Sequence, residues 1–453
     1  MSIFSELKCS LPPGEQAYQI AVSHSSVNPI LAVTTISRVL FFNDAGEKME
    51  LEIERGLTPT AIAWHPTHLV LAIGWQNGLI TLWYGDNNTT KEDANVHAAP
   101  VINITFNPNG HRMVTTDMKG VVAVWRNLSL MSSYQKDGPM THCIFCDLNL
   151  EKNEDKDKEK KEEQPEETKE RGRGRRDAKK KPEEEKKEEK KDKKKATQNL
   201  FFFGGKAGIV YVADDANHVT EVCKVSGAVK SLFFYEKTNS MIIITSTLLL
   251  VQFRISLSEK SQHDKKVKLS TAGNPEQLNS IWVGNSLLAT ICAENLVRAW
   301  HVEKDENYVL TLAQVDEINK GENLLNDKVL CIDYDEKNRI LVGGTQGGAC
   351  VFWKNMRAGE DSPYDNDQWK CLPTLRMANE PITQISIGKG SSMMAFKYPS
   401  GVSLVYETLI TGRLSENIKI LQNSSKHIQI YLKSELGQQV NKLDFLNKLI
   451  ISS

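Results

Sequence analysis

The sequence predicts an all-β protein built from repeated units of short strands, and three observations support that prediction. Short alternating or apolar runs bounded by Gly, Asn, Asp and Pro dominate the 453 residues, as expected for strands and tight turns. Amphipathic helical patterns are nearly absent before residue 410. One order of strands and turns recurs along the chain, and each copy closes on an aromatic residue.

The repeated unit is clearest at residues 60–83. A first strand leads to a His-Pro turn, a second strand to an Asn-Gly turn, and a third strand ends at Trp83. Residues 101–125 and 329–353 follow the same order and close on Trp125 and Trp353. Gly and Asn in these turns supply the backbone angles that tight hairpins require. We therefore expect each unit to be one antiparallel sheet.

The closing aromatic residues give the length of the repeat. They are Phe42, Trp83, Trp125, Tyr211, Phe253, Trp300, Trp353 and Tyr406. The gaps between them are 41, 42, 86, 42, 47, 53 and 53 residues, and excision of residues 151–196 shortens the gap of 86 to 40. Repeats of roughly 40–45 residues with four short strands are typical of a WD40-type β-propeller, in which a large ring fills the gap between blades.

The spacing leads to a division into two domains. Seven units end by Trp353, so we assign residues 1–375 to a first, seven-bladed propeller and residues 151–196 to a disordered charged insertion within blade 4. An eighth unit, at residues 382–406, either closes an eight-bladed ring or opens a second propeller. We choose the second option, with residues 376–453 as the start of an incomplete second propeller in a truncated chain. A cut near residue 375 should then give a more soluble monomer.

Composition bounds the class of protein. Residues 151–195 hold 20 Lys or Arg and 17 Asp or Glu, while the rest of the chain is poor in charge and carries a net charge of −4. A nucleic-acid binder with a strongly basic fold is therefore disfavoured. The first residues do not resemble a secretory signal, no apolar stretch is long enough to span a membrane, and the eight cysteines lack framework spacing. These features favour the cytosol.

The charged run at residues 151–196 has three interpretations. Its composition is that of a solvated disordered loop. Glu-Lys pairs after Pro182 are also compatible with a partly helical rod. The basic stretch Arg171–Arg176, with Lys179–Lys181, could serve nuclear import or touch RNA, anionic lipid or tubulin tails, although neighbouring Glu blocks weaken its field.

The motifs that resemble reactive sites are better explained by structure, and we assign no catalytic, cofactor-binding or metal-binding residue and no cofactor. Cys143 and Cys146 form a CxxC pair after His142, but they lie in an apolar run where they would point to opposite faces of a strand. Residues 204–208 and 343–348 are rich in glycine, yet no helix follows either of them, so both are expected to be hairpin turns.

The remaining polar candidates also fit turns. His65 and His68 flank Pro66 without a third metal ligand nearby in the sequence. Asp117, Asp333 and Asp335 lie next to turns, where Asp side chains usually accept hydrogen bonds from the backbone. No nucleophile elbow of the GxSxG type is present, so we expect no enzyme. A propeller enzyme and a vesicle-coat-like or RNA-associated scaffold remain as alternatives.

A set of collinear segments resembles the 140-kDa subunit of intraflagellar transport complex A. The segments are residues 63–75 with Gly78 and Trp83, Thr141–Phe145, Gly321–Asn323, Trp369, Pro373–Leu375 and Ile382–Ile385. The resemblance covers roughly residues 1–410. It implies a scaffold without catalytic residues, since that family combines two propellers with a helical solenoid, and this chain would hold the first propeller and the start of the second.

The resemblance also implies a function. The expected role is retrograde ciliary transport, cilium assembly and entry of membrane proteins into the cilium. The expected partners are the other complex A subunits, with complex B, the retrograde dynein motor and tubby-like cargo adaptors as further candidates. No specific nucleic acid is expected, and membrane association would arise only through the complex. The expected location is the ciliary axoneme and basal body, together with the cytoplasm.

Overall fold

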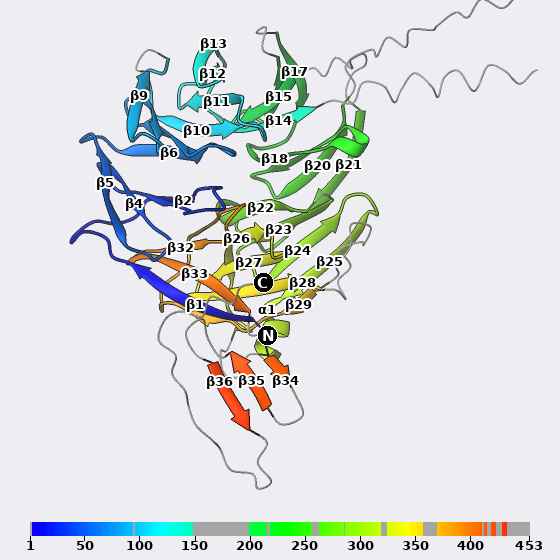
Figure 1. Cartoon of the computed structure of the whole chain (residues 1–453). Coiled ribbons are helices and arrows are strands. Elements are labelled where there is room, and N and C mark those ends of the chain that lie inside the picture. Colours follow the sequence, from blue (N-terminus) through cyan, green and yellow to red (C-terminus); the bar gives the residue numbers. More distant parts are fainter. Residues whose placement is uncertain are drawn as a thin grey trace, which may run out of the picture.

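The computed structural model describes most of the chain. The described residues are 2–93, 96–147, 199–214, 218–255, 262–284, 286–318, 324–356, 369–409, 412–414, 418–422 and 428–432. They form eight sheets of four strands each around a ring, with one short extra strand beside one sheet (Figure 1). The protein is therefore an all-β, WD40-like propeller, as the repeat predicted.

The blades follow the chain in order, and the first strand of each blade is innermost. Blade 1 holds β2 (Gln19–Val22), β3 (Leu31–Thr34), β4 (Arg38–Phe42) and β5 (Lys48–Glu54); blade 2 holds β6 (Pro59–Trp64), β7 (Val70–Trp75), β8 (Ile80–Tyr84) and β9 (Thr89–Asp93). Blade 3 holds β10 (Val101–Phe106), β11 (Arg112–Asp117), β12 (Val121–Arg126) and β13 (Ser129–Gln135); blade 4 holds β14 (Met140–Asp147), β15 (Asn199–Gly205), β16 (Ile209–Ala213) and β17 (Val219–Lys224).

The second half of the ring continues the pattern. Blade 5 holds β18 (Val229–Tyr235), β19 (Ser240–Thr245), β20 (Leu249–Arg254) and β21 (Gln262–Lys268); blade 6 holds β22 (Leu278–Val283), β23 (Leu287–Cys292), β24 (Leu296–His301) and β25 (Glu306–Thr311). Blade 7 holds β26 (Val329–Asp335), β27 (Ile340–Thr345), β28 (Ala349–Asn355) and β29 (Trp369–Cys371), with β30 (Leu375–Arg376) beside β28; blade 8 holds β31 (Gln384–Ile387), β32 (Met394–Tyr398), β33 (Gly401–Leu409) and β1 (Ser2–Cys9). Among the described residues, the helical segments are η2 (Glu236–Thr238), η3 (Pro275–Gln277) and α1 (Leu312–Ile318).

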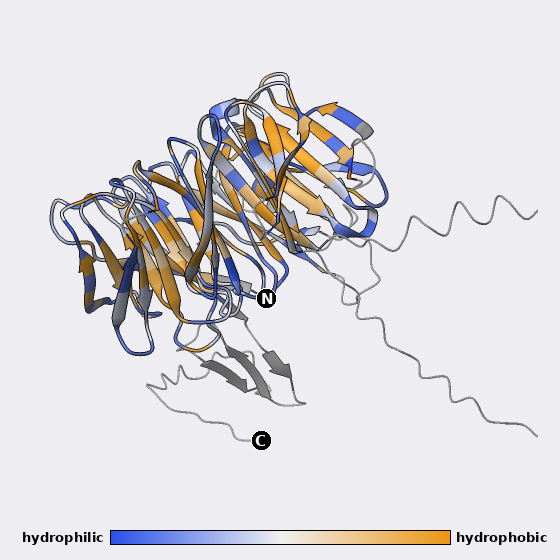
Figure 2. Cartoon of the chain, turned by 90° about the horizontal axis from the view of Figure 1, so that it is seen from above, coloured by the Kyte–Doolittle hydropathy of each residue, from blue (hydrophilic) through white to orange (hydrophobic). Residues whose placement is uncertain are grey.

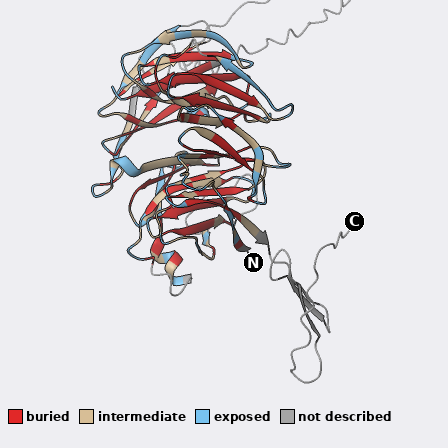
Figure 3. Ribbon diagram, turned by 90° about the vertical axis from the view of Figure 1, so that its left-hand side faces the viewer, coloured by how far each residue is buried: buried red, intermediate tan, exposed pale blue. Residues whose placement is uncertain are grey.

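The position of a strand in its blade decides its composition. Every residue of β7 is buried, because both faces of a blade pack against neighbouring blades. The outermost strand of the same blade, β9, has the sequence Thr-Thr-Lys-Glu-Asp and is largely exposed. Figure 2 shows hydrophobic residues concentrated in the strands, and Figure 3 shows that the exposed residues lie mainly in loops and at the edges of the ring. All eight predicted closing aromatics lie on the third strand of a blade.

The prediction of seven blades was wrong, because the N-terminal strand supplies the missing strand of an eighth blade. Strand β1 pairs antiparallel with β33 over its whole length, from Ser2 opposite Leu409 to Cys9 opposite Val402. The unit at residues 382–406 therefore closes the ring, and the boundary that we placed after residue 375 falls within β30 of blade 7.

Packing on both sides of blade 8 shows that the ring is closed. Phe4 and Phe352 stack with ring centroids 3.7 Å apart in the hydrophobic cluster between blades 7 and 8. Ile20 and Met393 belong to the cluster between blades 8 and 1. The innermost strands are also joined, since Gln384 Oε1 accepts from the Ile20 N–H at 3.1 Å and its Nε2 donates to the Ile20 carbonyl at 3.0 Å.

Two further sequence predictions concern segments outside or beside the ring. The charged insertion connects β14 with β15, which are paired neighbours in blade 4, with Asp147 opposite Asn199; the insertion itself lies outside the described residues. Strands β34 (Gly412–Leu414), β35 (Ile418–Gln422) and β36 (Ile428–Leu432) form a separate antiparallel sheet. That they begin a second propeller stays a prediction, and the strands expected at residues 440–445 and 448–451 lie outside the described residues.

Candidate functional site

The CxxC pair does not form one site. Cys143 and Cys146 both lie on β14, the innermost strand of blade 4, but their side chains face opposite neighbours. Cys143 packs against the cluster between blades 3 and 4, and Cys146 belongs to the cluster between blades 4 and 5. Neither thiol takes part in a disulfide within the described part of the chain, and burial raises the pKa of Cys143, so its reactive thiolate form is disfavoured.

The glycine-rich segments form hairpin turns. Gly208 lies between β15 and β16 with φ of 71°, and Gly348 lies between β27 and β28 with φ of 81°. A Cβ atom on Gly348 would come within 1.7 Å of the Ala378 carbonyl oxygen, so only glycine fits at this position of the turn. Strands follow both turns, and a phosphate-binding loop would need a helix there.

His65 holds a turn and the neighbouring blade together. Its Nδ1 atom accepts hydrogen bonds from the backbone N–H groups of Thr67 and His68, at 3.2 and 3.0 Å. Its Nε2 atom therefore carries the proton and donates to the Gly110 carbonyl at 3.0 Å. Burial lowers the pKa of His65, in keeping with a neutral ring.

The three aspartates all accept hydrogen bonds from turns or adjacent strands. Asp117 Oδ1 accepts from the N–H groups of Lys119 and Val121, both at 2.9 Å. Asp335 accepts from the N–H of Asn338 at 3.2 Å. Asp333 differs, because its Oδ2 accepts from Ile387 N at 2.9 Å and so links blade 7 to blade 8. Loss of hydration raises the pKa of Asp333 to about 6.

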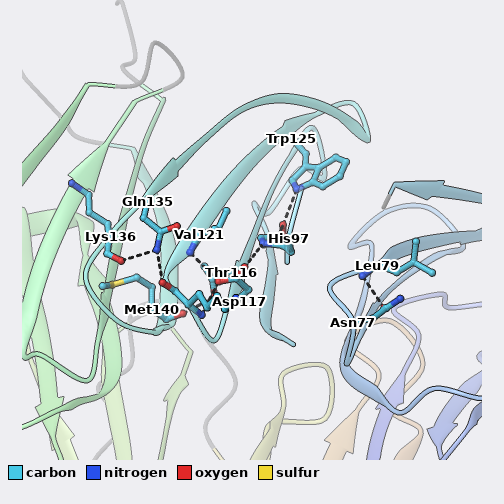
Figure 4. A network of polar contacts seen from close by, with 12 residues as sticks. Asn77, Leu79, His97, Thr116, Asp117, Val121, Trp125, Gln135, Lys136 and Met140 are labelled. Carbon is cyan, nitrogen blue, oxygen red and sulfur yellow. Dashed lines mark hydrogen bonds and ion pairs between the residues drawn. The ribbon is translucent and has the colours of Figure 1, made fainter. Parts of the chain in front are cut away.

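A buried polar network lies in blade 3 and includes two residues that sequence reasoning missed, His97 and Thr115. His97 lies in the loop before this blade, with Nδ1 3.3 Å from Asp117 Oδ2 and Nε2 2.7 Å from Thr115 Oγ1. Trp125 Nε1 donates to the same Thr115 oxygen at 2.9 Å. Figure 4 shows His97, Asp117 and Trp125 gathered between the strands of the blade. The network joins a loop, two strands and a turn.

The chemistry of this network is structural. The side chains of His97 and Asp117 are fully buried, and burial lowers the pKa of His97 although Asp117 acts in the opposite direction. The ring is therefore a neutral hydrogen-bonding bridge without access to a substrate. The usable sequence signal was the order His97, Asp117, Trp125, with a histidine before the first strand, an aspartate at the end of the second strand and a tryptophan in the third.

A polar cavity of about 770 Å³ lies at the turns of blades 1 and 2. Its lining includes His24, His65 and His68, with Asp44 and Asp86 nearby. Burial lowers the pKa of His24 to about 4, helped by Lys389, and its buried Nδ1 atom has no hydrogen-bond partner within the described part of the chain. Across that same part of the chain, no group of three or more His, Cys, Asp or Glu residues is arranged to hold a metal ion.

Acidification should lower the free energy of unfolding because several histidines stay neutral in the fold. Burial lowers the pKa of His142 to about 4 and that of His97 below its ordinary 6.5. As pH falls below 6.5, these histidines bind protons in the unfolded chain but stay neutral in the folded chain. The free energy of unfolding that they contribute above pH 6.5 is therefore lost as the pH falls. Each such proton contributes a slope of about 1.4 kcal/mol per pH unit. Asp333 opposes the trend between pH 6 and 4, since its folded pKa is raised.

Urea unfolding at pH 7, 6 and 5 would measure this net slope. His142→Gln should reduce this slope by the contribution of roughly one proton, about 1.4 kcal/mol per pH unit. The matched control is His218→Gln, which replaces a ring that is 80% exposed and should change stability at pH 7 by no more than about 0.5 kcal/mol. A midpoint that stays constant from pH 7 to pH 5 in the wild type would contradict the assignment of neutral buried histidines.

The comparisons with known proteins agree with this architecture. The C-terminal WD40 domain of Sif2 superposes with a TM-score of 0.57 at 11% identity, covering 89% of this chain and 98% of that one. The computationally designed Ika8 protein superposes with a TM-score of 0.54 at 12% identity, covering 86% of this chain and 98% of that one. At such identities these similarities show the fold alone.

The family comparison is more specific. A family model described as the IFT140 first beta-propeller matches residues 4–408, which begin in β1 and end in β33. Of the segments that carried the resemblance, Gly321–Asn323 lies outside the described residues, whereas Trp64, Trp83 and Ile382 are packed between blades. No helix among the described residues is long and apolar enough to cross a membrane. The chain belongs to the family of the IFT140 first β-propeller.

Proposed function

We propose that this chain is a non-enzymatic scaffold of intraflagellar transport complex A, acting in retrograde ciliary transport, cilium assembly and entry of membrane proteins into cilia. The observation that supports the proposal is the family match over residues 4–408. Several polar side chains have structural roles, which supports the proposal. The polar groups at Asp117, His65 and His97 hold turns and strands in place, and the two cysteines of the CxxC pair face different blades.

The proposed partners are the other complex A subunits, with complex B, the retrograde dynein motor and tubby-like cargo adaptors as further contacts of the assembly. The proposed location is the ciliary axoneme and basal body, with a cytoplasmic pool. A closed ring suits this role because its blades form a rigid body that presents loops and outer strands to several partners at once. Membrane association would come from the complex, and no specific nucleic acid is required.

Affinity purification from ciliated cells would test the proposal. The tagged full chain should co-purify complex A subunits and be enriched in cilia, and loss of the endogenous protein should slow retrograde movement of transport particles. A chain without residues 2–9, which loses the pairing of β1 with β33, shows whether recovery of the partners depends on an intact propeller. If the intact chain is monodisperse and folded but recovers no complex A subunit and is not enriched in cilia, the proposal is wrong.

A further inference from the structure

The outer ends of blades 5 and 6 enclose an apolar groove of about 290 Å³. Leu250 of blade 5 and Leu288 and Trp300 of blade 6 are buried and belong to the hydrophobic cluster between these blades. Val267 on β21 and Val309 on β25 also line the groove, and they are 38% and 39% exposed. We call this site the blade 5–6 groove.

The two valines share one groove although they lie on different blades. Exposed apolar side chains occur on other outer strands too, such as Leu130 on β13 and Leu7 on β1, whereas β9 is polar. Here each of two neighbouring outer strands places a β-branched apolar side chain in the lining of the same groove. Exposed apolar surface bounded by polar residues is typical of interaction sites. A volume near the lower end of the roughly 300–1000 Å³ of small-molecule pockets suits one or two side chains of a peptide.

The charged residues in the described lining of the groove are all basic. They are Lys265, Lys268 and Arg298. Lys265 pairs with Asp305 outside the lining and lies 5.2 Å from the centre of the Trp300 ring. Arg298 Nη2 contacts Glu294 Oε1 at 3.0 Å. Lys268 Nζ instead donates to the Thr247 carbonyl at 2.5 Å, so that contact leaves its charge uncompensated.

The backbone around the groove favours an extended occupant. Strand β21 is outermost in blade 5 and pairs with β20, and β25 is outermost in blade 6 and pairs with β24. The outer edge of such a strand can accept a further strand, and alternate side chains of that strand then enter one groove. We propose that the blade 5–6 groove binds an extended segment of a partner protein that carries one or two large apolar side chains flanked by Asp or Glu.

Fluorescence anisotropy of labelled peptides would test this. The probe is fluorescein-labelled Ser-Asp-Glu-Leu-Asp-Phe-Glu-Ser, added to the full chain. We expect saturable binding with a Kd of roughly 10–100 μM, weakened by added salt. A peptide with Lys in place of every acidic residue, and one with Ser in place of Leu and Phe, should each bind at least about 10-fold more weakly.

Variants at the groove separate binding from folding. Val309→Glu should weaken binding about 10-fold or more, because it places a like charge beside the acidic segment. Lys268→Glu should weaken it several-fold for the same reason. The control is Ile36→Glu, an apolar position that is 62% exposed in the turn between β3 and β4 of blade 1. All three variants should melt within a few degrees of the wild type, since these side chains are partly or largely exposed.

Three results would overturn the proposal. The first is no saturable binding of the acidic peptide below 1 mM, a Kd that corresponds to about −4 kcal/mol. The second is equal binding of the acidic and the lysine peptides. The third is a Val309→Glu variant that binds like Ile36→Glu. Displacement of the acidic peptide from this site by vesicles of phosphatidylserine and phosphatidylcholine would also overturn the proposal. It would indicate that the groove binds a lipid headgroup and not a peptide.

Discussion

Deletion of residues 2–9 should abolish the cooperative unfolding of the ring. This deletion removes β1, and with it the strand pairing to β33, the Phe4–Phe352 stack and the hydrogen bond from Ser403 Oγ to Glu6 Oε1. Blade 8 would keep three strands and expose a long edge. The expected loss is on the order of the whole stability of a domain, about 5–15 kcal/mol. Thermal unfolding followed by circular dichroism, with size-exclusion chromatography, would measure it.

Two further truncations act as controls. Deletion of residues 410–453 leaves every strand of the ring intact, so its melting temperature should stay close to that of the full chain. A cut after residue 375 removes β31, β32 and β33 and should give an insoluble product. The sequence had suggested that this cut would improve solubility, and the strand pairing predicts the reverse. If deletion of residues 2–9 melts like the full chain, closure by β1 does not stabilise the ring.

Asp117→Ala should lower the free energy of unfolding by about 3–5 kcal/mol, a value at the high end for one substitution, because each buried donor left without a partner costs about 1–3 kcal/mol. The carboxylate accepts from Lys119 N, Val121 N and His97, and its removal leaves buried donors without partners. Urea unfolding followed by tryptophan fluorescence would measure the change. Asp117→Asn keeps one acceptor oxygen and should cost less than the alanine variant.

The matched control for Asp117 is Asp86, which lies in a turn of blade 2 and is exposed. Asp86→Ala should change stability by no more than about 0.5 kcal/mol. His97→Gln can still donate one hydrogen bond, so it should destabilise the fold less than His97→Leu. Equal midpoints for Asp117→Ala and Asp86→Ala would show that the buried network contributes nothing to stability.

The repeat in the sequence was sufficient to predict the fold class because its cause is local. A large ring on the third strand fills the space beside each blade, so Trp83, Trp125 and the other closing aromatics mark the repeat directly. The number of blades could not be found this way. It depends on the pairing of Ser2 with Leu409, which are far apart in the sequence, and such a contact leaves no periodic signal in the sequence. Residues 2–9 precede the first unit of the repeat, and a strand there without a blade of its own was the sequence feature that could have indicated an eighth blade.

The functional surfaces were less accessible to sequence reasoning. His97 and Thr115 are ordinary residues in the sequence, and only their meeting with Asp117 gives them a role. Val267 and Val309 each fit a strand pattern, and their shared exposure appears only when blades 5 and 6 are placed side by side. The roles of turn residues such as His65 were easier to predict, because their hydrogen-bond partners lie only two or three positions further along the sequence.

The pairing of β1 with β33 also sets the response of the ring to mechanical tension. Ser2 is opposite Leu409, so the N-terminal end of β1 and the C-terminal end of β33 lie at the same end of the pair. In an antiparallel pair the hydrogen bonds lie perpendicular to the strands. A force applied between Ser2 and Leu409 would thus load these bonds one after another and peel β1 away, whereas shear would load them all together. Blade 8 is the point at which a pulled ring would open first.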